Sequence, residues 1–496
     1  MDGAGALIWP VKLQGQGGSI LNISRRKLVL GAGAGALAIG GAAVLTPMIR
    51  REGVLVESPS RAIPVESSEG PLPQSVDVAI IGGGIQGVCS ALFLAERGLS
   101  VVILEKGEIA GEQSGRAYSQ IISWELEEYV LPLILHSKEL WAGMNERIGA
   151  DTSWRIRPRV QTYTTEEGLA RAQAWAKMAK QTVPNPDLLR VRFIEGAELQ
   201  ERIPGARTPW KIGGIEDNAA SVDPEIGTPM IARYLKTQGV KIFTRCAVRG
   251  LETSGGRVSG VATEKGAIRA STVVLAGGAW SRLFLGNYGL QLRTLPVYLS
   301  QQRLSAVEGA PPGNGHIGDG VYWRLQADGT YASAPRIFIA PLVRESFTIG
   351  MDFVPHMIAG GMDGLPLYLS LNSDFVDSFT TPRHWKLDQV TPFEQVRVGA
   401  PTPNIEFLDL ALRRLRNEFP VFEKAKVIER WAGRMDFASD LAPVISTVDQ
   451  YPGLVINTAH GFGMTQGPAA GEIVADIVTG TTPKMNIKPY AFSRFA

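Results

Sequence analysis

The sequence predicts an α/β fold, α+β overall. A parallel-sheet domain built from several segments is interrupted by a mixed antiparallel-sheet domain and preceded by an N-terminal membrane helix. Three observations predict this class. Residues 77–106 have the pattern strand, glycine turn, helix, strand. Apolar strands followed by glycines recur at 272–278 and 453–463. Residues 290–352 alternate apolar and polar side chains, which is typical of an antiparallel sheet.

The glycine turn predicts a Rossmann-like dinucleotide site. Gly82, Gly84 and Gly87 have GxGxxG spacing after an apolar strand at 77–81. Gly82 permits the tight turn, Gly84 lets a pyrophosphate approach the backbone, and Gly87 lets the helix pack close to the strand. The helix N-terminus then offers N–H groups to phosphates. Glu105 ends the second strand, where it can accept hydrogen bonds from ribose hydroxyls of FAD or NAD.

The composition excludes several classes of protein. The chain has 496 residues, 45% hydrophobic and 20% charged, which is enough for two or three globular domains. A net charge of +2 provides no basic stripe for a nucleic-acid partner. Cys89 and Cys246 are too few for a disulfide framework. The five histidines are scattered without ligand spacing, so no metal site is predicted.

The N-terminus predicts a membrane anchor. Residues 1–23 are an extension without a clear signal, and 24–50 contain Arg25-Arg26 in a twin-arginine pattern followed by a Gly/Ala-rich apolar run. That run is about 20 residues, just long enough to cross a bilayer. A cleaved export peptide and a core helix are the alternatives. Retention is favoured because no small-x-small cleavage site precedes the charged residues that follow. Residues 51–75 read as a linker.

The order of the elements divides the rest of the chain. The dinucleotide-binding domain is predicted to comprise residues 76–122, 212–289 and 430–496, and the substrate domain residues 123–211 and 290–429. Residues 352–400 are an apolar stretch broken by Pro and Gly. This stretch is either a membrane-associated insertion or a strand pair of the substrate domain.

Ordered motifs run through nearly the whole chain from Ser24. They include SRRK, Gly70–Pro73, Leu94–Lys106, Ile109–Arg116, Ile194–Gln200, Ser221–Glu225 and Gly453–Pro468. With these motifs the chain resembles the D-amino-acid oxidase/glycine oxidase group of FAD enzymes, and more closely the membrane-bound L-amino-acid deaminases of Gram-negative bacteria. The resemblance implies oxidation of L-amino acids to 2-oxo acids and ammonia, with electrons passed to a respiratory quinone or cytochrome. It also implies a bacterial inner-membrane location, with the catalytic domain in the periplasm.

The same resemblance implies which residues bind FAD. They cluster in the glycine turn, after the second strand, beside the adenine and at the flavin ring: Gly82, Gly84, Ile85, Gln86, Gly87, Glu105, Lys106, Gln113, Ser114, Gly115, Arg116, Val248, Ala276, Gly277, Gly278, Gly461, Phe462, Gly463, Met464 and Thr465. Hydroxyl and guanidinium groups such as those of Ser114 and Arg116 are good phosphate donors.

Four residues are predicted to contact the substrate. Arg336 lies in an apolar strand, where a buried arginine needs an anion, and a substrate carboxylate would supply it. An internal ion pair or a solvated edge is the alternative. The resemblance implies substrate contact for Gln120, which could instead be a surface glutamine. Phe462 stands where those enzymes usually carry tryptophan, and Phe338 is an apolar wall or a core residue. Hydride transfer to the flavin needs no general base, so none is assigned.

The sequence is also compatible with two other functions. The first is an oxidase or dehydrogenase of the same fold that acts on glycine, sarcosine, proline or a D-amino acid. The second is a flavin-binding assembly factor without turnover, against which a pocket-lining Arg336 would argue. Covalent attachment of FAD through His460 is also open.

Overall fold

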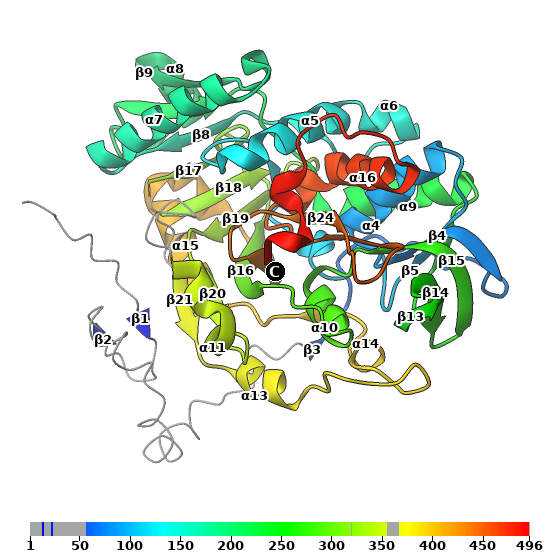
Figure 1. Cartoon of the computed structure of the whole chain (residues 1–496). Helices are drawn as coiled ribbons and strands as arrows, with labels where there is room; N and C mark the ends of the chain where they lie inside the picture. The colour runs from blue at the N-terminus through cyan, green and yellow to red at the C-terminus, as the bar shows by residue number, and fades with distance from the viewer. Residues whose placement is uncertain (1–11, 14–20, 23–55, 319, 355–366, 496) are drawn as a thin grey trace, which may run out of the picture.

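The computed structural model describes residues 12–13, 21–22, 56–318, 320–354 and 367–495. The predicted twin-arginine segment at 24–50 lies outside these residues. Among the residues that are described, no helix is both long enough and apolar enough to span a bilayer. Figure 1 shows two large sheets with helices packed around them.

The first sheet is the predicted parallel sheet. Its parallel strands run β12 (Lys241–Phe243), β5 (Val101–Leu104), β4 (Ser75–Ile81), β15 (Gly266–Leu275) and β25 (Leu454–Thr458). Antiparallel strands β14 (Arg257–Thr263), β13 (Val248–Ser254) and β24 (Val444–Thr447) extend it. All four residues of β5 are apolar and all four are buried, as expected for a parallel strand that is covered on both faces.

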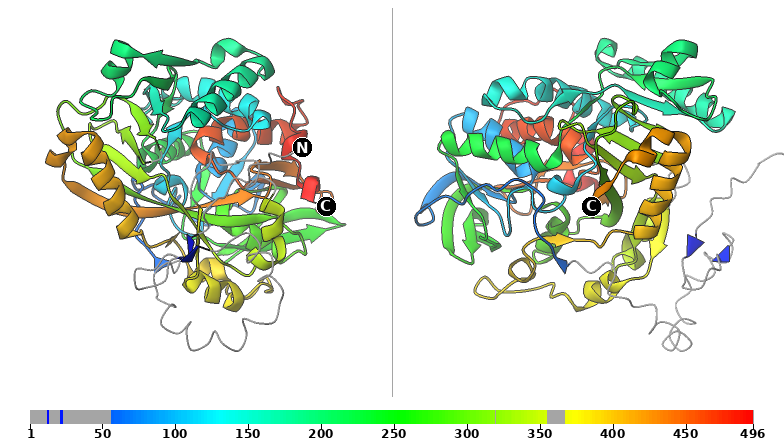
Figure 2. Two further views of the ribbon diagram at one scale, coloured as in Figure 1. Left: turned by 90° about the vertical axis from the view of Figure 1, so that its left-hand side faces the viewer. Right: turned by 180° about the vertical axis from the view of Figure 1, so that it is seen from behind.

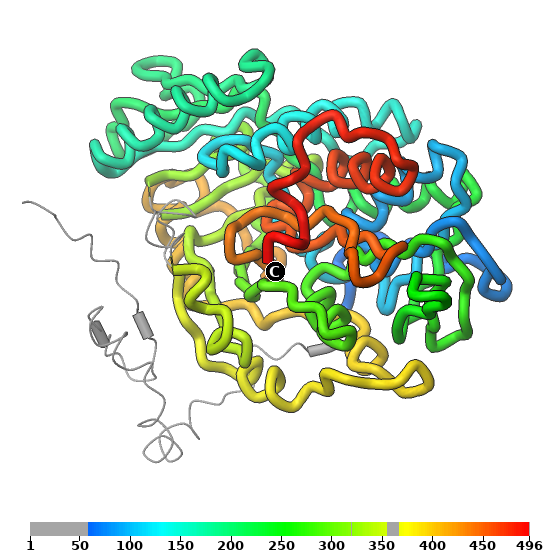
Figure 3. The backbone as a smooth tube through the Cα atoms, in the orientation of Figure 1, coloured from blue at the N-terminus to red at the C-terminus, as the bar shows by residue number. Residues whose placement is uncertain are grey.

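Helices from distant parts of the chain lie beside this sheet, with α4 and α16 in direct contact with its strands. They are α4 (Ile85–Glu96), α5 (Leu131–Ala142), α6 (Met144–Ile148), α9 (Pro224–Thr237), α10 (Ser281–Gly286) and α16 (Gly463–Thr479). Figure 3 shows the C-terminal α16 beside the N-terminal part of the chain. α16 packs on α4 at close range, since a Cβ on Gly471 would lie 2.5 Å from the carbonyl carbon of Cys89. The two helices therefore pack backbone to backbone behind the glycine turn.

The second sheet is the predicted antiparallel sheet. Its strand order is β21 (Leu367–Ser370), β20 (Phe338–Pro341), β16 (Thr294–Leu304), β19 (Tyr331–Pro335), β18 (Val321–Leu325), β17 (Asn314–Ile317), β8 (Arg159–Thr162), β10 (Ile212–Glu216) and β9 (Val191–Glu195), with β23 (Val427–Ala438) paired to β16. α15 (Ile405–Glu418) packs on it, and α7 (Glu166–Thr182) and α8 (Gly196–Arg202) lie at its β9 end (Figure 2).

Three small sheets accompany the two large ones among the described residues. β6 (Gln120–Ile121), β11 (Ala220–Ser221) and β7 (Arg155–Ile156) form one, β22 (Gly399–Ala400) pairs with β3 (Val56–Glu57), and β1 (Lys12–Leu13) pairs with β2 (Leu21–Asn22).

Strand pairing of the second sheet crosses two of the predicted domain boundaries. β10 pairs with β8 and β9 in the second sheet, although residues from 212 onward were predicted in the dinucleotide domain. β23 pairs with β16 along its whole length, so the second sheet extends to Ala438 rather than ending before 430. Main-chain hydrogen bonding, which the side-chain pattern does not encode, decides both cases.

The stretch from 352 to 400 is partly a sheet strand. β21 pairs parallel with β20, and α13 (Ser373–Thr380) and α14 (Pro392–Gln395) follow it, while α11 (Ser346–Ile349) precedes it. Residues 355–366 lie outside the described part. Residues 367–370 thus form one strand of the second sheet, and the choice between the two predicted alternatives stays a prediction.

A buried ion pair joins the second sheet to the N-terminus of α9. Arg324 on β18 donates from Nη1 to Asp223 Oδ1 at 2.7 Å, and both side chains are buried. Asp223 is the N-cap of α9 and lies in the SVDPE motif, and its Oδ2 accepts from Ala327 N at 3.0 Å. Satisfied lone pairs of this kind are what make a buried ion pair tolerable.

Candidate functional site

One large cavity runs from the first sheet to the second. At the first sheet it is lined by residues at the carboxyl ends of β4, β5, β15 and β25. At the second sheet its walls come from β8, β16, β18, β20 and β23. Ligands of open α/β sheets bind outside the carboxyl ends of the strands, so the cavity lies where the glycine motif predicts.

The three motif glycines are required by close backbone contacts. Gly82 has φ +110°, and a Cβ there would lie 2.4 Å from Ala276 O. A Cβ on Gly87 would lie 2.0 Å from Gly82 O, so α4 could not stay against the turn. A Cβ on Gly84 would reach Ser114 Oγ at 3.0 Å on the cavity side. The contacts at Gly82 and Gly87 explain why the turn and the helix packing need glycine, while the approach of a pyrophosphate at Gly84 remains a prediction.

Glu105 is held at the turn by backbone donors. Oε2 accepts from Gly83 N and Oε1 from Gly107 N, each at 2.7 Å. Burial raises the pKa of Glu105, and Lys106 and the two amides oppose that rise. The Lys106 amine is itself engaged by Glu112 Oε1 at 2.6 Å and by two main-chain carbonyls. The carboxylate is thus fixed beside the glycine turn, as a ribose-binding group requires.

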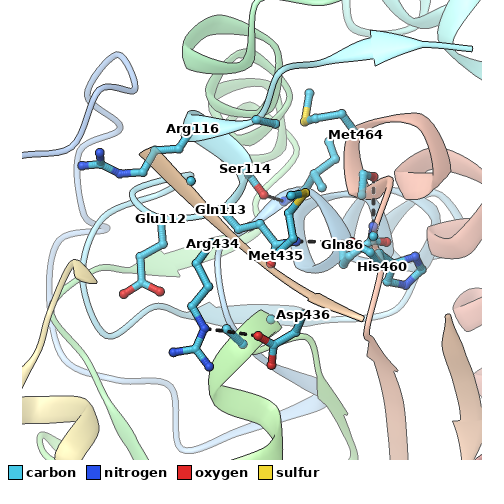
Figure 4. A pocket seen from close by; sticks show the side chains of 18 of the residues that line it. Gln86, Glu112, Gln113, Ser114, Arg116, Arg434, Met435, Asp436, His460 and Met464 are labelled. Atoms are coloured by element: carbon cyan, nitrogen blue, oxygen red, sulfur yellow. Dashed lines mark hydrogen bonds and ion pairs between the residues drawn. The ribbon is translucent and has the colours of Figure 1, made fainter. Parts of the chain in front are cut away.

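The segment 113–116 differs partly from its predicted role. Ser114 Oγ accepts from Ile85 N at 2.9 Å, which places its hydroxyl at the start of α4. Arg116 instead points away from Ser114 (Figure 4), and its Nη2 donates to Ser58 Oγ and Pro59 O at 3.0 and 2.8 Å. The sequence could not reveal that residues 58–59 take up this guanidinium. Its binding to a pyrophosphate remains a prediction.

The adenine-side residues and the start of α16 also line the cavity. The lining residues include Val248, Ala276, Gly277 and Gly278, and Gly461 to Thr465. A Cβ on Gly461 would lie 2.1 Å from the Phe437 ring. Thr465 donates to Gln120 O at 3.0 Å, which joins the start of α16 to β6. The helix N-terminus carries partial positive charge, which suits an electron-rich ring edge.

Hydrogen bonds hold His460 in one position beside the start of α16. Its Nδ1 lies 2.7 Å from Gln466 Oε1 and its Nε2 lies 2.8 Å from Asn457 Oδ1, while its carbonyl accepts from Gln113 Nε2 at 3.2 Å. Gln86 Nε2 donates to Gly463 O at 3.0 Å in the same network. Because both ring nitrogens have partners and the ring is buried, this geometry does not favour covalent attachment of FAD at His460.

The buried His460 predicts a pH dependence of stability. Burial lowers its pKa to about 4, and the Gln466 contact opposes that shift. Between that value and the usual 6.5 or so the unfolded chain binds more protons than the folded chain, so the unfolding free energy rises with pH. We expect the unfolding free energy to fall by about 3 kcal/mol as the pH falls from about 6.5 to about 4.

Chemical denaturation at several pH values, with His460→Asn beside the unaltered protein, measures this contribution. The variant should have a shallower dependence on pH over that window. His384→Asn, at an exposed site, is the matched control and should leave the dependence unchanged. Equal slopes for His460→Asn and the unaltered protein would show that His460 does not titrate in this way.

The four predicted substrate residues occupy different positions. Gln120 is buried and lines the cavity, so it is not a surface glutamine, and Phe338 also lines it. Phe462 lies at the start of α16 with 41% of its surface exposed. Arg336 lies not in a strand, as predicted, but in the turn between β19 and β20, where it is 8% exposed and donates from Nη1 to Gly318 O at 2.8 Å. It is not among the residues that line the cavity; its Cζ lies 5.7 Å from the ring centroid of Tyr322, which does line it.

The sequence prediction missed several polar residues of the cavity. Arg159 on β8 and Arg434 on β23 both line it. Arg434 Nε lies 3.2 Å from Asp436 Oδ1 (Figure 4). Burial would lower the pKa of Arg434, but Asp436, Tyr298 and Asp374 together raise it, so the group keeps its charge. The argument that selected Arg336, an arginine in an apolar strand, does not select Arg159, because β8 reads RVQT and is mostly polar.

The residues of the cavity fit FAD. Backbone exposed at glycines, helix N-termini at α4 and α16, and the Glu105 carboxylate are the groups that a pyrophosphate, a flavin edge and a ribose require. The side chains of the described residues contain no cluster of His, Cys, Asp and Glu that could hold a metal ion.

Comparison with known proteins places the chain in a family. The model of the family "DAO: FAD dependent oxidoreductase" matches residues 77–477. The structure of an L-amino acid deaminase from Proteus myxofaciens in complex with anthranilate is 56% identical, covers 90% of this chain and 100% of its own, and superposes with a TM-score of 0.87. An L-amino acid deaminase from Proteus vulgaris is 46% identical, covers 87% and 100%, and has a TM-score of 0.84.

A glycine oxidase from Pseudomonas putida is 25% identical over 426 residues, which are 84% of this chain and 98% of the oxidase. The family match spans both sheets and the whole cavity. The chain therefore belongs to the DAO family of FAD-dependent oxidoreductases, and FAD is its cofactor.

Proposed function

We propose that this enzyme oxidises L-amino acids to 2-oxo acids and ammonia. The observation that carries the proposal is its 56% identity to the Proteus myxofaciens deaminase over the whole of that chain. That protein binds anthranilate, an aromatic ring with adjacent amino and carboxylate groups. The substrate end of the present cavity has matching chemistry, because aromatic and aliphatic walls such as Phe338, Phe437 and Leu441 accompany buried arginines.

The protein contributes positioning and exclusion of water. FAD, when bound, supplies the acceptor for the hydride that leaves the substrate Cα. A guanidinium holds the carboxylate, and apolar walls favour the neutral amine, whose nitrogen lone pair assists loss of the hydride. Alignment of this kind lowers the barrier without a general base. Gln120, Phe338 and Phe462 are the proposed side-chain contacts, and Arg336 is a proposed carboxylate ligand.

Replacing Arg336 by alanine tests that last assignment. A charge-assisted, two-point hydrogen bond made equally in the ground and transition states should appear in KM rather than in kcat. We expect KM for L-phenylalanine to rise about 100-fold with kcat changed by less than about threefold. Steady-state kinetics with an artificial electron acceptor measures both constants. An unchanged KM would refute the role.

We further propose that electrons pass to a respiratory quinone or cytochrome and that the chain is anchored in a bacterial inner membrane, with the catalytic domain in the periplasm. The sequence pattern at 24–50 supports the anchor. Exposed apolar side chains around α11 and α13 support a second membrane contact: Phe347, Met351, Val376 and Phe379. A chain lacking residues 1–50 should still float with inner-membrane vesicles, and complete loss of flotation would contradict the second contact.

Glycine oxidation is the second candidate, favoured by the Pseudomonas relative. Parallel assays of ammonia, 2-oxo acid and peroxide separate the two. The proposed function predicts ammonia and 2-oxo acid from L-amino acids, quinone-dependent turnover and little peroxide. Turnover of glycine or sarcosine with one peroxide formed per substrate molecule consumed would favour the oxidase instead.

A further inference from the structure

Arg159 is a buried cation on the cavity wall for which neither the motifs nor the family match gives a role. It begins β8, is 5% exposed, and lines the cavity with Gln120 and Tyr322. Its acceptor partners among the described residues are neutral: Gln161 Oε1 at 2.6 Å and His316 Nδ1 at 3.1 Å. Nε is buried without an acceptor from the described residues. A guanidinium has only donors, so this environment favours an anion beside it.

His316 links Arg159 to Arg336. β17 pairs parallel with β8, which brings His316 opposite Gln161, and the ring is 2% exposed. Nδ1 faces Arg159 and Nε2 lies 3.3 Å from Arg336 Nη1, so the two guanidiniums meet opposite edges of one imidazole. Burial, with the charges of Arg336 and Arg159, holds the pKa of His316 well below its usual range.

A neutral imidazole can accept only one hydrogen bond, but two donors face it. The contact with Arg159 is the shorter, and Arg336 Nη1 has another acceptor in Gly318 O at 2.8 Å. We therefore assign the tautomer in which Nδ1 accepts from Arg159 and Nε2 carries the proton. In this tautomer His316 and Gln161 together fix the plane of the Arg159 guanidinium (3.1 and 2.6 Å).

We propose that Arg159 is a second cation that binds the substrate α-carboxylate, with His316 as its positioning residue. The inference rests on the proposed function for the identity of the anion. It also names the substrate class, amino acids with one carboxylate and a large apolar or aromatic side chain. Apolar walls of the same cavity support that class, because Trp124, Leu126 and Phe437 are among its lining residues.

The test uses the FAD-loaded full chain and two readouts. Benzoate, a carboxylate without an amino group, is titrated against the flavin absorbance, and kinetics are measured with L-phenylalanine and L-glutamate. Arg159→Gln should weaken the binding of benzoate about 30-fold and raise KM for L-phenylalanine by a similar factor. The value of kcat should change by less than about threefold. Arg159→Lys should restore part of both. Arg192→Gln, at an exposed arginine of β9, is the matched control.

His316 variants separate positioning from a general structural role. His316→Phe removes the acceptor for Arg159 and should weaken the binding of benzoate about tenfold. His316→Gln keeps an acceptor and should retain most of the affinity for benzoate. Equal losses in both variants would overturn the positioning role.

Unchanged benzoate affinity in Arg159→Gln and Arg159→Lys would overturn the carboxylate role. A defect confined to L-glutamate would show that Arg159 reads a side-chain carboxylate, which also contradicts the proposal. If no L-amino acid reduces the flavin, the proposed function fails, but the benzoate result still decides whether Arg159 binds a carboxylate. Flavin content and circular dichroism identify any variant that fails to fold, and Arg159→Lys then carries the test.

Discussion

Replacing Gly87 by alanine is expected to abolish retention of FAD during purification. The new Cβ would lie 2.0 Å from Gly82 O, well inside contact distance, and that oxygen belongs to the turn itself. Relief requires α4 to move off β4, which also moves the helix N-terminus away from the phosphates. Overpacking of this kind costs up to about 3 kcal/mol. If that cost is taken from the binding free energy of FAD, the cofactor binds about 100-fold more weakly.

Gly286→Ala is the matched control for this prediction. Gly286 ends α10, and a Cβ there would meet no atom within 4 Å. The measurements are the ratio of flavin to protein absorbance and the dissociation constant of FAD from the reconstituted apoprotein. Full flavin content in Gly87→Ala would show that the turn can rearrange at little cost, contrary to the geometry.

Replacing Glu216 by alanine is expected to give the largest loss of stability. Glu216 is fully buried, accepts from Lys138 Nζ at 2.5 Å and from Ser123 N at 2.9 Å, and also from Ser123 Oγ at 2.5 Å. Burial alone would raise the pKa of Glu216, but Lys138 and the Ser123 hydrogen bonds outweigh it, so the net shift is downward. Removing one partner leaves Lys138 as a buried, unpaired cation, which costs about 3–5 kcal/mol.

A double replacement shows whether this loss comes from the unpaired charge. Glu216→Leu with Lys138→Met removes both charges and should recover much of the unfolding free energy, because an apolar pair of similar volume is often neutral. Glu198→Ala, at an exposed carboxylate paired with Arg192, should leave the transition unchanged. Urea denaturation compares the four proteins. Equal stability of Glu216→Ala and the unaltered chain would contradict the burial argument.

Local patterns allowed the first sheet to be predicted well. The strand at 101–104 was predicted with its observed bounds, and the first helix starts three residues before the predicted Val88 because it follows Gly84 directly. α16 starts at Gly463 rather than Ala469, since Gly467 and Pro468 obscure the helical pattern of its first turns. α15 was not among the predicted elements, although its buried Leu408, Ala411, Leu412 and Leu415 have helical spacing.

The candidate site could be predicted only where its residues belong to one local unit of structure. The glycine turn and Glu105 lie within a single strand–turn–helix–strand unit, so their geometry follows from that unit. The contact of Arg159 with His316 depends on the pairing of β8 with β17, across 157 residues of chain. The orientation of Arg116 likewise depends on residues 58–59, which no local pattern places beside it. Long-range pairing is set by the whole fold rather than by any local pattern.

Anaerobic reduction of the bound flavin tests the central claim most directly. The FAD-loaded chain is mixed in turn with L-amino acids, D-amino acids, glycine and sarcosine while the flavin absorbance is followed. The proposed function predicts loss of the absorbance with L-amino acids only, fastest for large apolar side chains. Reduction by D-amino acids, glycine or sarcosine, or by no amino acid at all, would contradict it.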